Sequence, residues 1–476
     1  MRFGLTKVAP LVLVAVGVAT AAAACSSSDR RSGFDAPKDD AGVEAGPAFV
    51  QGDAPCVGLE CKREKCDDGS TTTLTGKVYD PAGVNALYNV LVYIPGGTNG
   101  DDELPAIPEG VSCETCASVA VNPLVSALTD TQGAFTLENV PVDKDVPVVI
   151  QIGKWRRRLT IDIPKKCEEN KVPKGDFRLP RNGSEGDMPH IAVTAGGCDA
   201  LECLLRGIGV DDEEFVPGHS TDGHVHVFNG QGGNFPGAPK AGGDTANPLG
   251  GELWNDSAQL AKYDMVMLSC ECGENNGNKG GETGHELTGA RQAMWDYANM
   301  GGRIFATHFH STWFKNSPQV DFQMVANWNT VASSSNSTYD VVESMADGSA
   351  FPKGAALADW LVGVKASKTR GKITLEDVTS SLSSVNAPAQ GWIRQGENNV
   401  KYFSFNTPTN APVEEQCGRA VYSDLHLMGI SAGGQEFPTG CPASGGLSAQ
   451  QKALEFMFFD LSGCVQDDKT PPSVPK

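Results

Sequence analysis

The sequence predicts a multidomain protein in which an N-terminal all-β sandwich precedes a doubly wound α/β domain. From Leu74 to Pro164, short β-rich runs alternate apolar and polar residues with period two, and turn residues separate them. From His190 onward, short apolar strands alternate with helical patterns, which is typical of a parallel sheet with helices on both faces. A connector rich in Pro, Gly and Asn, residues 164–188, separates the two patterns.

Composition narrows the class of partner. The chain has 476 residues, 40% of them hydrophobic, and a formal net charge of -20. This charge argues against nucleic acid and against electrostatic docking on anionic lipid, because both need a basic face. The one dense basic run, Lys154 to Arg158, is expected to be a solvated hairpin turn.

The first residues predict export. Arg2 and Lys7 precede an apolar run, and small residues lead to Cys25 in the stretch "AAAC". This stretch resembles a bacterial lipobox, which implies lipidation of Cys25; the alternative is an ordinary A-x-A site cut at the same bond. We expect a signal peptide at 1–24 and a disordered tether with a cysteine knot at 25–71. An aspartate after the lipidated cysteine is the usual cue for retention in the inner membrane, and here serine follows Cys25. We therefore expect a lipid anchor at the outer membrane or cell surface.

Residues 72–165 form the predicted β-sandwich. They show the pattern G-x-V-x-D-P-x-G, then N-V-x-V, T-D-x-x-G-x-F and N-V-P, which resembles the carboxypeptidase regulatory-like (transthyretin-like) domain. Such domains are usually non-catalytic. The matching residues are Gly76, Val78, Asp80, Gly83, Val90, Val92, Thr129, Asp130, Gly133, Phe135, Val140 and Pro141. An insertion carries "CETC", for which a Cys113–Cys116 structural disulfide is preferred to a redox or zinc motif.

Residues 186–464 form the predicted α/β domain, followed by a disordered tail at 465–476. Four strands are expected at "HIAVTAGG", "HVHVF", "YDMVML" and "RIFATHFH", and two closing strands at "NVKYFSFN" and "RAVYSDLHL". Helices are expected at "CDALECLLRGIG", "ELTGARQAMWDYANMGG" and "LSAQQKALEFMFFDLSGC". Residues 314–398 are interpreted as an excursion made mostly of loops and helices.

The stretches "YDMVML", "YANMGGRIFATHFHSTW" and "RAVYSDLH" resemble the class I glutamine amidotransferase-like fold, and within it the ThuA-like (trehalose-utilisation-like) group. Amidotransferases carry a nucleophilic cysteine in a tight elbow after a strand. The corresponding elbow here is "ATHFHS", with His308 at the nucleophile position. This departure argues against glutaminase chemistry.

Histidines at strand ends are the main candidate site residues. His308 and His310 are two positions apart, so on a strand both side chains can face the same side. Two imidazoles placed in this way could provide two of the ligands of a metal site. The ThuA-like resemblance implies that His426 ends a strand near the same elbow, with Asp424 to orient it. Three interpretations are open: packed histidines, a sugar-binding pocket that uses His308 and Trp313, or a metal or hydrolytic site.

Fourteen cysteines in an exported chain predict disulfides. If strands one and three are neighbours, as in a flavodoxin-like order, four cysteines gather at one edge. Cys203–Cys270 and Cys198–Cys272 are then the expected pairs, with a reactive Cys270 thiolate as the alternative. A Cys417–Cys441 bridge is expected near the C-terminus. The remaining cysteines have no predicted partner; these are Cys56, Cys61, Cys66, Cys167 and Cys464.

Two functions from different classes follow. The first is a cell-envelope lipoprotein of binding or display type, in which a catalytically silent amidotransferase-like domain holds a carbohydrate or another surface polymer. The alternative is an extracytoplasmic enzyme acting on sugars, with a histidine acid/base or metal site. The missing nucleophile favours the first. No cofactor is predicted under it, and a divalent metal is expected only under the second.

Overall fold

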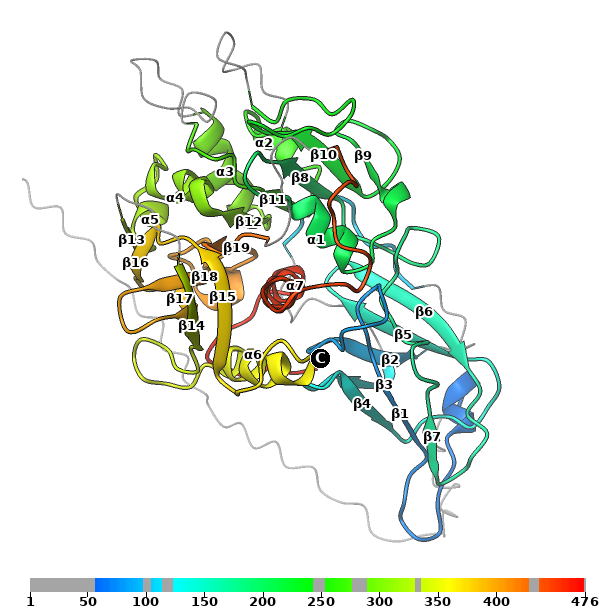
Figure 1. The fold of residues 1–476 in the computed structure, drawn as a ribbon. Coiled ribbons are helices and arrows are strands. Elements are labelled where there is room, and N and C mark those ends of the chain that lie inside the picture. The colour runs from blue at the N-terminus through cyan, green and yellow to red at the C-terminus, as the bar shows by residue number, and fades with distance from the viewer. Residues whose placement is uncertain are drawn as a thin grey trace, which may run out of the picture. The chain divides into compact units, whose positions relative to one another are not determined.

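The computed structural model describes residues 56–96, 104–113, 123–242, 253–275, 289–329, 335–427 and 436–474, all within a compact unit that begins at Cys56 (Figure 1). The structure is multidomain, with many strands and some helices, and the strands form four sheets. No helix among these residues is long and apolar enough to cross a membrane.

Two small sheets make up the first part of the described chain, after the short helix η1 (Gly58–Lys62). One has the order β4-β1-β7 and the other the order β3-β2-β5-β6. Leu137 of the first sheet and Ile150 of the second are fully buried in the same apolar cluster, so the two sheets share a core. Gly133, in the turn before β4, takes the left-handed conformation, with φ 69°. The strand bounds are β1 (Thr73–Lys77), β2 (Leu91–Pro95), β3 (Pro123–Leu128), β4 (Ala134–Glu138), β5 (Val146–Ile152), β6 (Trp155–Ile161) and β7 (Glu169–Lys171).

A ten-stranded sheet dominates the rest of the structure, in the order β15-β14-β17-β18-β19-β12-β11-β8-β10-β9. The six strands from β19 to β9 are parallel to one another, and β18 pairs antiparallel with β19. The predicted first and third strands, β8 and β11, pair directly, as expected. The bounds of the six are β8 (Ile191–Ala195), β9 (Phe215–Pro217), β10 (Val225–Asn229), β11 (Met265–Leu268), β12 (Arg303–Thr307) and β19 (Gly418–Ser423).

Helices cover both faces of the parallel strands. In β12 the side chain of Phe305 lies in one apolar cluster and those of Ile304 and Ala306 in another, since alternate residues of a strand face opposite sides. Helices α1 and α7 bury residues in the first cluster, and α3 in the second. The helix bounds are α1 (Leu201–Gly207), η2 (Asp212–Glu214), α2 (Ser257–Leu260), α3 (Gly289–Asn299), η4 (His308–Ser311), α4 (Thr312–Lys315), α5 (Val320–Gln323), α6 (Pro352–Gly363), η5 (Val413–Glu415) and α7 (Ala449–Ser462).

The segment 314–398 differs from its prediction. It is not mostly loop and helix, because three of its strands extend the large sheet in antiparallel fashion beyond β18. Two further strands form a separate ladder, β13-β16. The bounds are β13 (Ala326–Trp328), β14 (Ser335–Val341), β15 (Lys372–Val378), β16 (Leu382–Val385), β17 (Gln390–Arg394) and β18 (Val400–Thr407).

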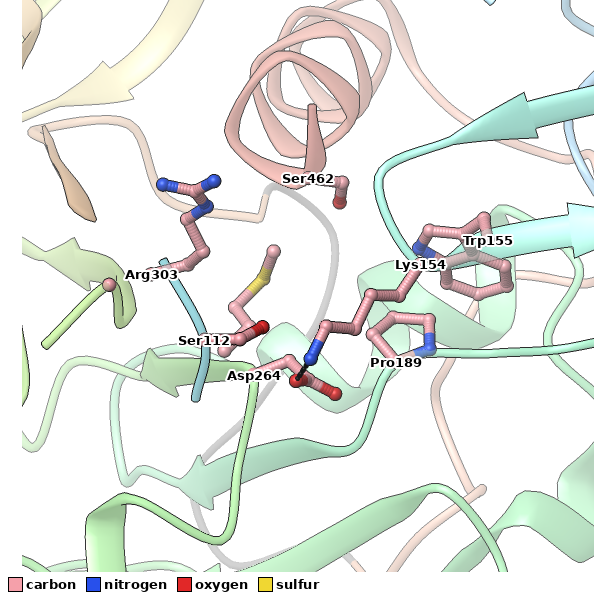
Figure 2. A pocket seen from close by; sticks show the side chains of 9 residues that line it. Ser112, Lys154, Trp155, Pro189, Asp264, Arg303 and Ser462 are labelled. Carbon is pink, nitrogen blue, oxygen red and sulfur yellow. Dashed lines mark hydrogen bonds and ion pairs between the residues drawn. The ribbon is translucent and has the colours of Figure 1, made fainter. Parts of the chain in front are cut away.

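The basic run Lys154 to Arg158 begins at the hairpin turn between β5 and β6, as predicted, but its first residues are not solvated. Lys154 is buried, and its ammonium group donates to the carbonyls of Pro108 and Gly110 and pairs with the carboxylate of Asp264. Figure 2 shows this pair among the side chains that line a small cavity. The volume of the cavity is about 20 Å³. That volume holds about one water molecule, so the cavity is a packing feature rather than a ligand site.

Candidate functional site

The candidate site lies at the carboxyl edge of the parallel strands. The ends of β8, β11, β12 and β19 meet there because these strands run in the same direction and pair with one another. Open α/β sheets bind their ligands at this edge. Cys270 follows β11, His308 follows β12 and His426 follows β19.

These three residues form one cluster. A ligand atom of each lies within 4.8 Å of a ligand atom of the other two. The Sγ atom of Cys270 is 3.3 Å from Nδ1 of His308, and the ring centroids of His308 and His426 are 4.9 Å apart. The structure therefore brings His308 and His426 to a shared edge, as the sequence analysis expected, and adds Cys270.

The backbone at His308 is bent sharply. His308 has φ 42°, in the left-handed region that residues with a Cβ atom rarely adopt. It begins η4 directly after the buried strand β12, so the chain turns at this position. The Tyr422 hydroxyl lies 2.8 Å from the His308 carbonyl, to which it donates. Strained residues of this kind gather at functional sites.

The thiol of Cys270 is buried and held from several sides. Its backbone N–H donates to Oγ1 of Thr307 over 3.0 Å, and its carbonyl accepts from the Cys198 N–H over 2.9 Å. Burial raises the pKa of the thiol to about 12, although the N–H groups of Phe309 and Cys272 donate toward the sulfur and oppose this. The thiol is therefore protonated at neutral pH unless a cation binds to it.

Two buried carboxyl groups lie beside the cluster. Asp199 accepts hydrogen bonds from the N–H groups of Ala200 and Leu427, over 3.0 and 3.1 Å. Burial raises the pKa of Asp199, and the charge of His426 acts in the opposite direction. Burial also raises the pKa of Glu202, to about 8. Buried acids with raised pKa values are typical of functional sites.

The donor set fits a tetrahedral transition-metal ion. One thiolate and two imidazoles are common zinc ligands, with bonds of about 2.3 Å to sulfur and about 2.0 to 2.1 Å to nitrogen. Tetrahedral geometry then places sulfur and nitrogen roughly 3.5 Å apart. The observed 3.3 Å between Cys270 and His308 is close to this value.

Three other predicted site residues do not join the cluster. His310 uses both ring nitrogens elsewhere: Nε2 lies 2.9 Å from the Ser269 carbonyl, and Nδ1 accepts from the indole N–H of Trp313 over 2.8 Å. Trp313 is fully buried, so it offers no face to a sugar. Asp424 accepts from the hydroxyl of Thr379 and therefore anchors the chain that follows β15 instead of orienting His426.

The disulfides correct the predicted connectivity. Cys198–Cys272 forms as predicted, but Cys203 pairs with Cys441 instead of Cys270. Cys203 lies on α1, which faces the segment around Pro442, since Arg206 donates to the Pro442 carbonyl over 3.0 Å. Cys270 is consequently a free, buried cysteine.

Two further predicted bridges are wrong. Cys417 pairs with Cys113, so neither the Cys417–Cys441 nor the Cys113–Cys116 bridge forms; Cys116 itself lies outside the described residues. The structure also pairs Cys56 with Cys61 and Cys66 with Cys167, and Cys464 is disulfide-bonded. The five described disulfides indicate an extracytoplasmic protein.

Two residues of the site were missed by sequence reasoning. Cys270 was assigned to a disulfide, although a lipidated Cys25 would leave an odd number of cysteines and hence a free one. Asp199 carried no signal beyond its place after the first apolar strand.

Comparison with known proteins gives no family. No family model matches the chain, and no curated protein matches it. Among solved structures, a ThuA-like protein from Bacteroides uniformis is 10% identical, with 56% of this chain and 89% of that chain covered and a TM-score of 0.28. A cytoplasmic protein from Salmonella typhimurium is 10% identical, with 50% and 87% covered and a TM-score of 0.27. A cohesin–X-dockerin complex from Acetivibrio cellulolyticus is 17% identical, with 32% and 78% covered and a TM-score of 0.16. TM-scores this low do not define a shared fold.

Proposed function

We propose that this chain is an exported, lipid-anchored cell-envelope protein whose carboxyl-edge cluster binds a divalent transition-metal ion. The observation that carries the proposal is the convergence of Cys270, His308 and His426, whose ligand atoms lie within 4.8 Å of one another. Three separate strand ends supply them, so the cluster is a product of the tertiary fold rather than of local sequence.

The chemistry of the donors selects the ion. A thiolate with two imidazoles favours Zn²⁺ or a similar first-row ion over Ca²⁺ and Mg²⁺, which prefer oxygen ligands. A bound ion would supply the positive charge that deprotonates Cys270, whose pKa burial otherwise raises to about 12. Three protein ligands leave one tetrahedral position for water or a substrate, which is the arrangement of catalytic rather than structural zinc sites.

This donor set favours the second of the two functions considered from sequence, an extracytoplasmic enzyme with a metal site, over a catalytically silent display domain. His308 occupies the elbow position at which the amidotransferase resemblance would place a nucleophile. The elbow therefore contributes a ligand rather than a covalent catalyst. The ThuA-like resemblance of the sequence supports a carbohydrate or surface polymer as the ligand of the open position.

The proposed architecture is a carboxypeptidase regulatory-like sandwich that carries an amidotransferase-like α/β domain. The shared core of the two small sheets supports the first part. The parallel order β10-β8-β11-β12-β19 supports the second. The proposed anchor at Cys25 lies outside the described residues and rests on the "AAAC" stretch.

Metal binding can be tested on the purified protein without its signal segment. The protein is stripped with a chelator and titrated with Zn²⁺ in the presence of a competing indicator. We expect one equivalent of tight binding, which Cys270→Ser and His308→Ala weaken by more than about 100-fold, since even outer-shell partners are worth 10- to 100-fold. His219→Ala is the matched control, because His219 is an exposed histidine outside the cluster. Equal affinity in all four proteins would refute the proposal.

A further inference from the structure

Asp199 is connected to every ligand-bearing segment of the cluster, although it is not one of the three ligands. It follows β8 and is buried. Its Oδ1 atom accepts from the N–H of Leu427 over 3.1 Å, and Leu427 is the residue directly after His426. The same oxygen accepts from the N–H of Ala200, which fixes the carboxylate on its own loop.

A second connection runs through Thr307, the residue directly before His308. The Thr307 hydroxyl donates to the Leu268 carbonyl over 3.2 Å and also interacts with the Asp199 carboxylate. The same hydroxyl oxygen accepts from the N–H of Cys270 over 3.0 Å. Asp199 thus touches the His426 segment directly, the His308 segment through Thr307, and the Cys270 segment through the same hydroxyl.

Two atoms at this position lack partners. Oδ2 of Asp199 and Nε2 of His426 are both buried, and neither has a hydrogen-bond partner within the described part of the chain. Leaving such atoms unsatisfied costs free energy, so their persistence in one neighbourhood needs a reason. No hydrogen bond joins these two atoms, so the carboxylate acts on His426 through its charge; a carboxylate near a ligating histidine raises the basicity of its ring.

We propose that Asp199 is the positioning residue of the metal centre, holding the ligand-bearing segments at coordination distance through the N–H of Leu427 and acting on His426 through its charge. This inference rests on the proposed function, because it assigns a role at the same site. It gives Asp199 an electrostatic part as well as a mechanical one, since its carboxylate would stabilise the charge that the ion places on the imidazole.

The decisive variant is Asp199→Asn, and the matched control is Glu202→Gln. Asparagine keeps an oxygen that can accept from Leu427 and Ala200, so the backbone connections survive while the charge is lost. Glu202→Gln removes the neighbouring buried carboxyl, whose charge acts on Asp199, and therefore tests whether the loss of any buried acid near Asp199 has the same effect. For each protein, Zn²⁺ affinity is measured by competition at neutral pH, Co²⁺ spectra report the thiolate ligand, and thermal unfolding is recorded in chelator.

We expect Asp199→Asn to weaken Zn²⁺ binding by about 10- to 100-fold. Its Co²⁺–thiolate absorption band and its metal-free melting temperature should remain, and Glu202→Gln should bind like the unaltered protein. Unaltered affinity in Asp199→Asn would overturn the inference, as would an equal loss in both variants, which would indicate a general charge effect. If Cys270→Ser also bound Zn²⁺ normally, the metal centre itself would be refuted, so the two failures can be told apart.

Discussion

The thiol of Cys270 and the Nδ1 atom of His308 lie 3.3 Å apart, at the ends of the neighbouring parallel strands β11 and β12. Neither strand could produce this pair alone. The direct pairing of β11 with β12 sets the distance, and the left-handed turn at His308 begins the short helix η4 immediately beyond it. Several consequences of this arrangement and of the surrounding structure can be measured.

Native Cys270 should resist alkylation. Its side chain is buried and its pKa is raised to about 12, so little thiolate is present at neutral pH. Peptide mapping after iodoacetamide treatment should find Cys270 unmodified in the folded protein and modified after unfolding in denaturant. Labelling of the folded protein would instead identify Cys270 as an accessible nucleophile.

The turn at His308 should favour glycine over alanine. Both His308→Gly and His308→Ala delete the imidazole, but only alanine keeps a Cβ atom in the left-handed conformation at φ 42°. We expect the glycine variant to be more stable by about 1 kcal/mol in metal-free urea denaturation. The opposite ranking would mean that this turn relaxes when the ring is removed.

Stability should fall as pH rises because of a buried acid pair. The buried carboxyl groups of Asp80 and of Glu455 on α7 interact with each other, and burial raises the pKa of both, that of Asp80 to about 6. A raised pKa means that the folded state holds the proton more tightly. The stabilisation is therefore complete below about pH 4 and is lost as pH rises through about 6, by about 3 kcal/mol at most. The free energy of unfolding of Glu455→Gln and of the unaltered protein can be measured by chemical denaturation at pH 4 and pH 8. The value for Glu455→Gln, minus that for the unaltered protein, should be more positive at pH 8. A pH-independent difference would contradict this.

Replacing Lys154 should lower the free energy of unfolding far more than replacing Arg158 in the same basic run. Lys154→Met would remove the ammonium group that pairs with the buried carboxylate of Asp264; the two side chains are only 7% and 9% exposed. We expect a loss of about 3 to 5 kcal/mol in the free energy of unfolding. Arg158→Met is the control from the same basic run, because Arg158 is exposed. Equal losses would show that the run acts by its overall charge.

The proposed anchor has a direct test. In a bacterial host, Cys25→Ser should release the protein from the membrane fraction, and the intact mass of the unaltered protein should include a diacylglyceryl group. Unmodified protein in the medium of the unaltered strain would rule out lipidation.

The parallel strands could be predicted because they are buried on both faces. "RIFAT" became β12, and the polar residue after it marks the sheet edge, so His308 could be placed at this edge from its sequence. The ThuA-like resemblance placed His426 beside it. The strands β14 and β15 could not, because exposed residues alternate with buried ones along them and they pair with each other only through contacts between distant parts of the chain.

The chemistry at the edge was harder to predict than its location. Strand adjacency suggested that Cys203 and Cys270 would lie near each other, but it carries no information on which way α1 turns Cys203. From the sequence, Trp313 was expected to line a sugar-binding pocket because it follows the turn. The tertiary fold instead packs it against Trp254, with 5.2 Å between the ring centroids.

The position of β19 between β12 and β18 determines when the cluster can first exist. Cys270 and His308 are synthesised well before His426, yet His426 reaches them only after β19 has paired with strands on both sides. A chain that crosses a membrane unfolded would therefore carry three separated ligands, each with little affinity for an ion. The complete centre would assemble, and acquire its metal, only where the whole chain has folded.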